Sequence, residues 1–243
     1  MRLALRTTVL LLAASAAAAQ SIPGAVLAKR EPHHHMVYED STIRVLRVRV
    51  PAHDTTLLHE HDPDYFWIAL GASTLVNAKP GTPDATVTSP DLAFHYSVGN
   101  FAHVARNPGD GPFDNITVEL LGAQTDVRNL CEPAVANKAL DCPTATGASA
   151  YFNGATEHAA LTSTQLRVSL LTVAPGGTVR PTARARHTWI IALDTMDTRS
   201  NLAIVRSGKW VGGTMRGSDA WAIENRGRSP VKAIAVVETR AAR

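Results

Sequence analysis

The sequence predicts an all-β protein built from two similar barrels in tandem. Short runs rich in β-branched and aromatic residues are separated by turn signals such as Pro80-Gly81 and Pro175-Gly176-Gly177. No long stretch has the 3.6-residue period of an amphipathic helix. Short antiparallel strands at this spacing close most readily as a jelly roll or small barrel, which protects the sheet edges. The 243 residues, of which 45% are hydrophobic, suffice for two such barrels.

An internal repeat divides the chain into two halves. The repeat opens with alternating apolar runs that begin at Ile43 and at Leu166, each with a one-residue slip that indicates a bulge. Later landmarks keep the same order in both halves, which chance rarely produces. They are Trp67-Ile68-Ala69-Leu70 with Trp189-Ile190-Ile191-Ala192, then Gly99, His103 and Asn107 with Gly217, Trp221 and Asn225, and finally Ile116-Thr117-Val118 with Ile234-Ala235-Val236.

Three histidines of the first half are candidate metal ligands. His59 and His61 alternate in one short stretch, and His103 lies in a second one. Imidazole binds iron, manganese, nickel, copper, cobalt and zinc, so these residues indicate one divalent transition-metal ion without choosing among the six. Three protein ligands would leave coordination positions open, as in catalytic sites. The alternative is that all three are ordinary solvated or packed strand histidines.

The second half lacks this set of histidines. The aligned positions fall near Pro181, Ala183 and Trp221, none of which binds a metal ion. A lone imidazole, His187, aligns with Tyr65 of the first half. We therefore expect the chemistry in the first barrel and a structural or partner role for the second.

The histidine stretches resemble the two signature motifs of the cupin superfamily, in particular those of an exported two-cupin protein. The family patterns are G-x5-H-x-H-x3,4-E-x6-G and P-x-G-x2-H-x3-N. This chain approximates the first with His59, His61 and Gly71, and the second with the segment from Val98 through His103 to Asn107. The resemblance implies two jelly-roll β-barrel cupin domains, a metal ion held by the three histidines of the first, and a degenerate second cupin.

Tyr65 occupies the position where the family places its glutamate ligand. On a strand that continues in register, Tyr65 shares a face with Trp67 while Asp64 points the other way. We expect Tyr65 to be catalytic, as an axial ligand or a general acid or base; the alternative is an aromatic side chain that only lines the barrel. Asp64 and Asn107 are expected to support the ligands from behind, with a solvated turn as the alternative for Asp64.

Trp67, Tyr96 and Phe101 are expected to form an aromatic pocket wall, which favours a small organic substrate. Core packing is the alternative for these residues. The leading hypothesis is an exported metal-dependent enzyme, either dioxygenase-like or a lyase or hydrolase that uses metal-bound water. The missing glutamate weighs against a dioxygenase of the quercetinase type. The alternative hypothesis is a non-enzymatic bicupin that binds a metal ion or a metabolite.

The N-terminus predicts export to the periplasm or the medium. Arg2 and Arg6 precede a short apolar run, and Ala17-Ala18-Ala19 offers a cleavage site. In an oxidising compartment Cys131 and Cys142 are expected to form a local disulfide. The expected boundaries are a signal peptide at 1–19, an N-terminal arm at 20–36, a first barrel at 37–121, a connector at 122–158 and a second barrel at 159–243.

The tract His33-His34-His35 falls in the expected arm. We interpret it as part of a mobile segment, with metal scavenging or capping of the barrel mouth as alternatives. The formal net charge of +3 drops to +1 once Arg2 and Arg6 are removed with the leader. This balance favours neither nucleic acid nor a membrane as a partner. A small-molecule substrate is expected, and the resemblance allows a homodimer formed through edge strands.

Overall fold

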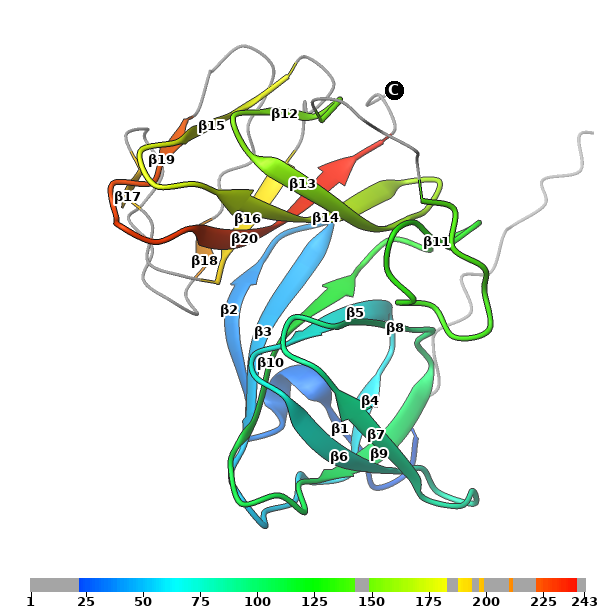
Figure 1. Ribbon diagram of the computed structural model, residues 1–243. Coiled ribbons are helices and arrows are strands. Elements are labelled where there is room, and N and C mark those ends of the chain that lie inside the picture. The colour runs from blue at the N-terminus through cyan, green and yellow to red at the C-terminus, as the bar shows by residue number, and fades with distance from the viewer. Residues whose placement is uncertain are drawn as a thin grey trace, which may run out of the picture.

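The computed structural model describes residues 22–142, 149–182, 188–193, 197–198, 210–211 and 222–239. Within these ranges the chain consists of strands and one short 3₁₀ turn, arranged as two barrels (Figure 1). The predicted all-β class with tandem barrels is thereby confirmed. No helix in the described part of the chain is long and apolar enough to cross a membrane. The expected signal peptide lies outside the described residues.

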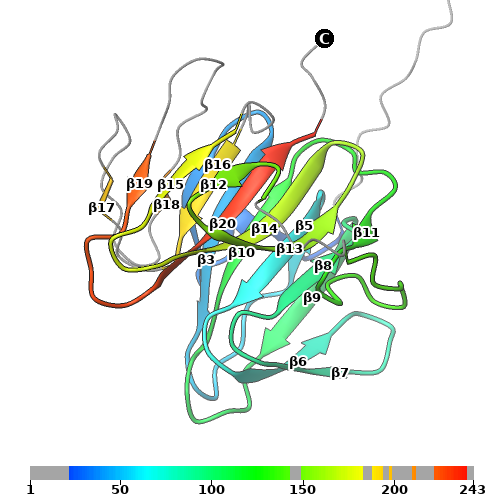
Figure 2. The ribbon, with the colours of Figure 1, turned by 45° about the horizontal axis from the view of Figure 1, so that its top comes forward.

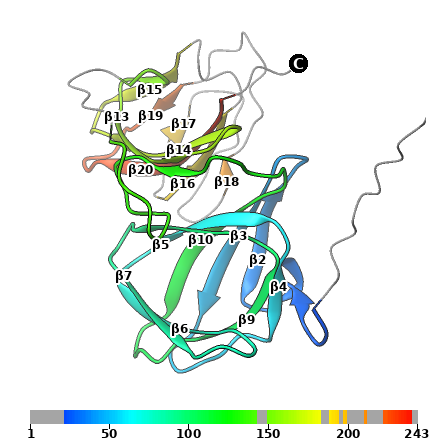
Figure 3. The same cartoon turned by 90° about the vertical axis from the view of Figure 1, so that its right-hand side faces the viewer.

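The first barrel is a pair of five-stranded sheets that face each other (Figure 3). One sheet has the strand order β1-β4-β9-β6-β7 and the other has the order β2-β3-β10-β5-β8. The strands are β1 (Val26–Leu27), β2 (His34–Glu39), β3 (Ile43–Val50), β4 (His59–His61), β5 (Asp64–Ala69), β6 (Ser73–Ala78), β7 (Ala85–Ser89), β8 (Phe94–Ser97), β9 (Phe101–Arg106) and β10 (Phe113–Leu120).

The described part of the expected N-terminal arm belongs to the first barrel, so that expectation was wrong. β1 pairs in parallel with β4, with Val26 opposite His59, and β2 pairs with β3, with His34 opposite Val48. The 3₁₀ turn η1 (Ala28–Arg30) carries the chain from one sheet to the other. Both strands lie at the edge of a sheet. An edge strand is partly exposed to solvent, so its sequence need not show a strong alternation of apolar and polar residues. The sequence pattern therefore contained no sign of them.

The second barrel has a six-stranded sheet with the order β11-β13-β14-β20-β16-β18 and a four-stranded sheet with the order β12-β15-β19-β17. The strands are β11 (Arg128–Asn129), β12 (Phe152–Asn153), β13 (Thr156–Thr162), β14 (Leu166–Val173), β15 (Thr178–Pro181), β16 (Thr188–Ala192), β17 (Asp197–Thr198), β18 (Trp210–Val211), β19 (Ile223–Glu224) and β20 (Val231–Glu238). The expected connector contributes β11, β12 and the start of β13 to these sheets. It also contains the disulfide between Cys131 and Cys142.

β10 separates the interior of the first barrel from the second barrel. All of its side chains are buried. Ile116, Val118 and Leu120 pack outward into an apolar cluster that β14, β16 and β20 also enter, between the facing sheets of the two barrels (Figure 2). The side chains in between alternate to the opposite face and point into the first barrel. They are Asn115, Thr117 and Glu119.

The interior of the second barrel is apolar at the matching positions. β20 pairs with β14 in the same register in which β10 pairs with β3. Ala233, Ala235 and Val237 therefore correspond to Asn115, Thr117 and Glu119, the inward residues of β10. All three belong to the apolar core of the second barrel. The described interior of this barrel therefore offers no polar side chain where the first barrel has a row of three.

The strand register shifts one pair of the repeat by a single residue. Trp189 lies opposite Val236 on β20, whereas Phe66, and not Trp67, lies opposite the matching Val118 on β10. Trp189 and Phe66 both pack in the cluster between the barrels. Trp67 faces the opposite way, into the first barrel, and the residue at its place in the second barrel is aliphatic.

Candidate metal centre

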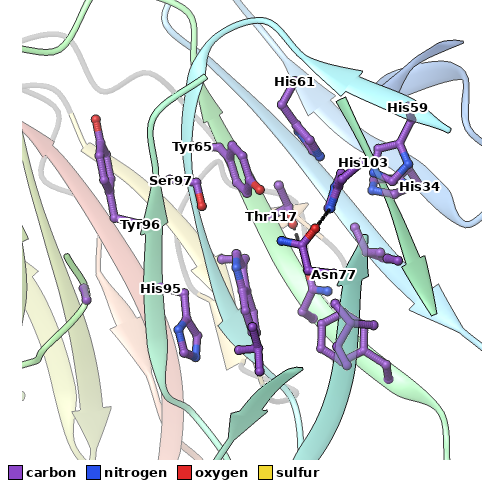
Figure 4. A pocket seen from close by; sticks show the side chains of 18 of the residues that line it. His34, His59, His61, Tyr65, Asn77, His95, Tyr96, Ser97, His103 and Thr117 are labelled. Carbon is purple, nitrogen blue, oxygen red and sulfur yellow. Dashed lines mark hydrogen bonds between the residues drawn. The ribbon is translucent and has the colours of Figure 1, made fainter. Parts of the chain in front are cut away.

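Four imidazole rings meet inside the first barrel (Figure 4). His59 and His61 lie on one face of β4, His103 lies opposite His59 on β9, and His34 comes from β2. Ligand nitrogens of His34, His59 and His61 all lie within 4.8 Å of one another. The His103 ring centroid is 4.4 Å from that of His59 and 5.4 Å from that of His61. The three histidines predicted from the sequence are thus together, and His34 joins them.

Each of the four rings is held through its Nδ1 atom by an oxygen outside the cluster. The partners are Oε2 of Glu31 for His34 at 2.6 Å, the carbonyl oxygen of Leu57 for His59 at 2.9 Å, Oε1 of Glu119 for His61 at 3.1 Å, and Oδ1 of Asn77 for His103 at 2.8 Å. Carbonyl, amide and carboxylate oxygens accept, so each Nδ1 carries a proton and donates it. The Nε2 lone pair of every ring is then available to a metal ion, which is how metal-binding histidines are usually oriented.

The buried Nε2 atoms of His59 and His103 have no hydrogen-bond partner. An unpaired buried polar atom costs about 1–3 kcal/mol, and a bound metal ion would remove that cost. Burial, with the neighbouring histidines, lowers the pKa of His59 to about 3 and lowers the pKa of His103 as well. Both rings are therefore neutral near neutral pH, which is the form that binds metals. The residues fit a transition-metal ion: His34, His59 and His61 would hold it, and His103 lies beside them as a further ligand.

Two buried carboxylates support the rings, and the sequence analysis missed both. Burial opposes ionisation of Glu31, but hydrogen bonds from His34 and His33 outweigh it and lower its pKa to about 2. Burial likewise opposes ionisation of Glu119, and hydrogen bonds from His61 and Arg44 again lower the pKa. The available signal for Glu119 was a charged residue between Val118 and Leu120 on a predicted strand.

Tyr65 lies flat on the ring of His61, with centroids 4.2 Å apart and planes at 22°. Its side chain is buried, and it lines the same cavity as the histidines (Figure 4). Burial raises the pKa of the Tyr65 hydroxyl to about 12. The hydroxyl therefore keeps its proton near neutral pH, so it can donate a hydrogen bond and cannot serve as a base.

A cavity of about 200 Å³ adjoins the four histidines. Trp67 lines it and stacks on His95, with ring centroids 4.1 Å apart and planes at 19°. Tyr96 lines the cavity too, as expected, whereas the third expected wall residue does not. Phe101 packs edge-on against His103 and is not among the lining residues. The ring of Tyr96 points away from the histidines, and its hydroxyl donates to Asp64 (Figure 4).

Asp64 supports a turn, which corrects the expected role behind the metal ligands. Its Oδ1 accepts the backbone N–H of Gly99 at 2.9 Å, and its Oδ2 accepts the hydroxyl of Tyr96. The turn is tight, because a Cβ atom on Gly99 would lie 2.3 Å from the carbonyl oxygen of Asp62. Asp64 thus fixes the approach to β9, and these two hydrogen bonds do not involve the histidines.

Asn107 also holds a turn. Its Nδ2 donates to the carbonyls of Val50, Pro51 and Gly111, and its Oδ1 accepts the N–H of Gly109. Asn225 makes matching bonds to Val173, Ser229 and Gly227. Because the same network recurs in the barrel that lacks the histidine set, Asn107 serves the fold and does not support the metal ligands. The agreement also places these two asparagines at equivalent positions of the repeat.

The counterparts of the histidines in the second barrel are described only in part. Pro181 ends β15. Ala183, His187 and Trp221 lie outside the described residues. The expectation of a metal-free second barrel therefore rests on residue types at these positions and on the apolar core described above.

Comparisons with known proteins identify the fold. No family model matches the chain, and no curated protein matches it either. Among solved structures, AerE from Microcystis aeruginosa is similar with a TM-score of 0.55 and 10% identity, over 86% of this chain and 94% of that one. A single-residue mutant of Bacillus subtilis oxalate decarboxylase is similar with a TM-score of 0.52 and 12% identity, over 86% and 76% of the two chains.

A single-residue mutant of salicylate 1,2-dioxygenase from Pseudoaminobacter salicylatoxidans also has a TM-score of 0.52, at 10% identity, over 87% of this chain and 76% of that one. Identities this low compare architecture, not activity. The architecture agrees with the motifs: sheets that enclose a histidine cluster in the first barrel, followed by a second barrel of the same design. The chain therefore has the fold of the cupin superfamily, as two cupin barrels in tandem.

Proposed function

We propose that this protein is an exported metal-dependent enzyme that acts on a small organic molecule. The observation that carries the proposal is the set of four histidines, His34, His59, His61 and His103, each oriented through Nδ1 so that Nε2 is free. Such orientation is the usual arrangement behind metal ligands. A purely structural metal site is normally closed, whereas this cluster borders a cavity.

The similar structures support the metal more than the reaction. One is a Bacillus subtilis oxalate decarboxylase with Mn(II) centres, and it is 11% identical to this chain with a TM-score of 0.51. Another is a salicylate dioxygenase. A dioxygenase-like oxidation and a lyase or hydrolase reaction both remain within the proposal, since neither similarity reaches the level at which an activity can be transferred.

The roles of this chain's own residues follow from their contacts. A bound transition-metal ion would supply Lewis-acid or redox chemistry. Glu31 and Glu119 hold two of the ligand rings in orientation. Tyr65 keeps its proton beside His61 and can donate it to a developing negative charge on the substrate. Trp67 and His95 form one wall and exclude water from the substrate.

Export is part of the proposal because of two independent features. The first residues have the composition of a cleavable leader. Cys131 and Cys142 form a disulfide, and disulfides persist mainly in oxidising compartments such as the periplasm.

Metal analysis of the purified mature protein tests the proposal. We expect about one transition-metal ion per chain, lost in His103→Ala and in His59→Ala. His53→Ala is the matched control, because His53 is an exposed residue of the same barrel that bonds only to Asp110. No bound metal in the wild type would refute the proposal. Bound metal without turnover, in an oxygen-consumption and hydrolysis screen of small organic compounds, would favour a metal- or metabolite-binding protein instead.

A further inference from the structure

The walls of the cavity beside the histidines contain no fixed charge. Among the described residues that line it there is no lysine, arginine, aspartate or glutamate. Lys79 is a cation near His103, but its Nζ lies 3.8 Å over the ring of Phe101, which is not a lining residue. A charged substituent in this cavity would therefore be desolvated without an oppositely charged side chain in the walls.

The charge of a metal ion would be opposed from outside the cavity. Glu31 and Glu119 are buried carboxylates that contact His34 and His61 on the sides of those rings that carry Nδ1. Such carboxylates raise the basicity of the ligand rings and offset part of the charge of the ion. Glu119 also pairs with Arg44, but Arg44 pairs in turn with Glu39, so this cation does not cancel both carboxylates behind the rings. A negative charge on the substrate is therefore not needed to balance the centre.

The cavity does offer hydrogen-bond donors. The Oδ1 atom of Asn77 accepts from His103, and the Oδ1 atom of Asn115 accepts the hydroxyl of Thr117 at 2.8 Å. The hydrogen bonds of the described residues thus occupy both amide oxygens and leave both Nδ2 groups as donors for a ligand. Such donors suit a carbonyl or hydroxyl oxygen.

The remaining walls suit a flat ring. Trp67 presents an aromatic surface, fixed by its stack on His95 and by the edge of Phe113, and Leu75 and Val87 complete an apolar side. The volume of about 200 Å³ limits the ligand to a small ring with few substituents, since an engineered cavity of about 150 Å³ holds benzene.

We propose that the cavity selects small uncharged ring compounds that carry a carbonyl or hydroxyl oxygen, and that it discriminates against carboxylates of the same shape. The amide of Asn115 binds that oxygen. This inference deepens the proposed function and rests on it, since it names the substrate class for the same site. It differs from what the names of the similar oxalate and salicylate enzymes would suggest for this chain.

Calorimetric titration with benzamide and benzoate, which match in shape and differ in charge, tests the inference. The titrations use the full mature protein, metal-free and loaded with Zn²⁺, near neutral pH where benzoate is ionised. We expect benzamide to bind at least about tenfold more tightly than benzoate to both forms, because the walls set the preference. Toluene, a ring without oxygen, should bind more weakly than benzamide.

Two variants test the role of the donor. Asn115→Ala should weaken benzamide binding by about fivefold, as for the loss of one hydrogen bond, while zinc content and melting temperature show that the site and fold persist. Thr86→Ala, at an exposed residue of β7 that does not line the cavity, should leave the affinity within about twofold. Benzoate binding as tightly as benzamide, or no binding of either ring, would overturn the inference. A protein that binds no metal refutes the proposed function, and the metal-free titration then still decides the ligand class.

Discussion

Nδ1 of His34 lies 2.6 Å from Oε2 of Glu31, and both side chains are buried. This bond joins the residue that directly follows η1 to the first residue of β2. It turns the ring of His34 toward His59, with centroids 4.5 Å apart. Tyr65 occupies the position at which the cupin motif has its glutamate. His34, on β2, adds a fourth imidazole ring to the cluster.

His34→Ala should lower the affinity for the metal ion by more than about 100-fold, since loss of a group that merely supports a ligand costs about 10–100-fold. Competition with a chelator measures the affinity. His35→Ala is the matched control, because His35 is the next residue of β2 and is exposed. Equal affinities in the two variants would remove His34 from the ligand set.

Glu119→Gln should weaken metal binding by about 10–100-fold, because an amide is a poorer acceptor for Nδ1–H of His61 than a carboxylate. Glu119 also binds Arg44, which pairs on its other side with Glu39. Glu39→Gln therefore removes a partner of the same arginine without touching a histidine, and it should leave the affinity unchanged. A similar loss in both variants would mean that the arginine, not the carboxylate behind His61, matters for binding.

Much of the fold was predictable because burial leaves a pattern with the period of the strand. Ile116 and Val118 recur as Ile234 and Val236, and both pairs pack between the two barrels. The alternation predicted strands, and its repetition predicted two barrels. The alignment of Trp67 with Trp189 was wrong by one residue. Adjacent residues on a strand face opposite sides, so this shift exchanges the wall of the cavity with the apolar cluster between the barrels.

The site was predictable only where the ligands follow a local motif. His59 and His61 lie two apart on one strand, which is a spacing that sequence alone can recognise. His34 lies in a run of three identical residues, where no contrast marks which ring turns inward. Glu119 reaches His61 across the barrel, and such a contact depends on the closure of the sheets, which no short stretch of sequence encodes.

The metal-free protein should lose stability as the pH falls below about 6.5, the ordinary pKa of histidine. The native pKa of His59 is lowered to about 3, so between these two values the unfolded chain binds a proton that the native state excludes. The free energy of unfolding then falls by up to about 1.4 kcal/mol per pH unit for such a histidine. Urea denaturation at a series of pH values measures the slope. His59→Gln should show a shallower slope, and identical slopes would contradict the burial of a neutral ring.

Asn107→Ala should lower the free energy of unfolding by about 1–3 kcal/mol, because the variant leaves buried backbone groups of its turn without partners. Asn225→Ala, at the matching turn of the second barrel, should show a similar loss. Neither variant should change the number of metal ions bound per folded chain. A selective loss of metal in Asn107→Ala would return this residue to the support of the histidines.

The disulfide between Cys131 and Cys142 should stabilise the part of the connector that borders the cavity. The loop that it closes contributes Pro133, Ala134 and Ala136 to the lining, and the carbonyl of Ala134 accepts the N–H of Tyr96 at 2.7 Å. Replacing both cysteines by serine should cost about 2–3 kcal/mol, through the greater freedom of the unfolded chain. Limited proteolysis should cleave this loop faster in the double variant, as in the wild type under reducing conditions. The variant itself should not respond to reductant, and equal cleavage of oxidised and reduced wild type would show that the other hydrogen bonds of the loop suffice to hold it.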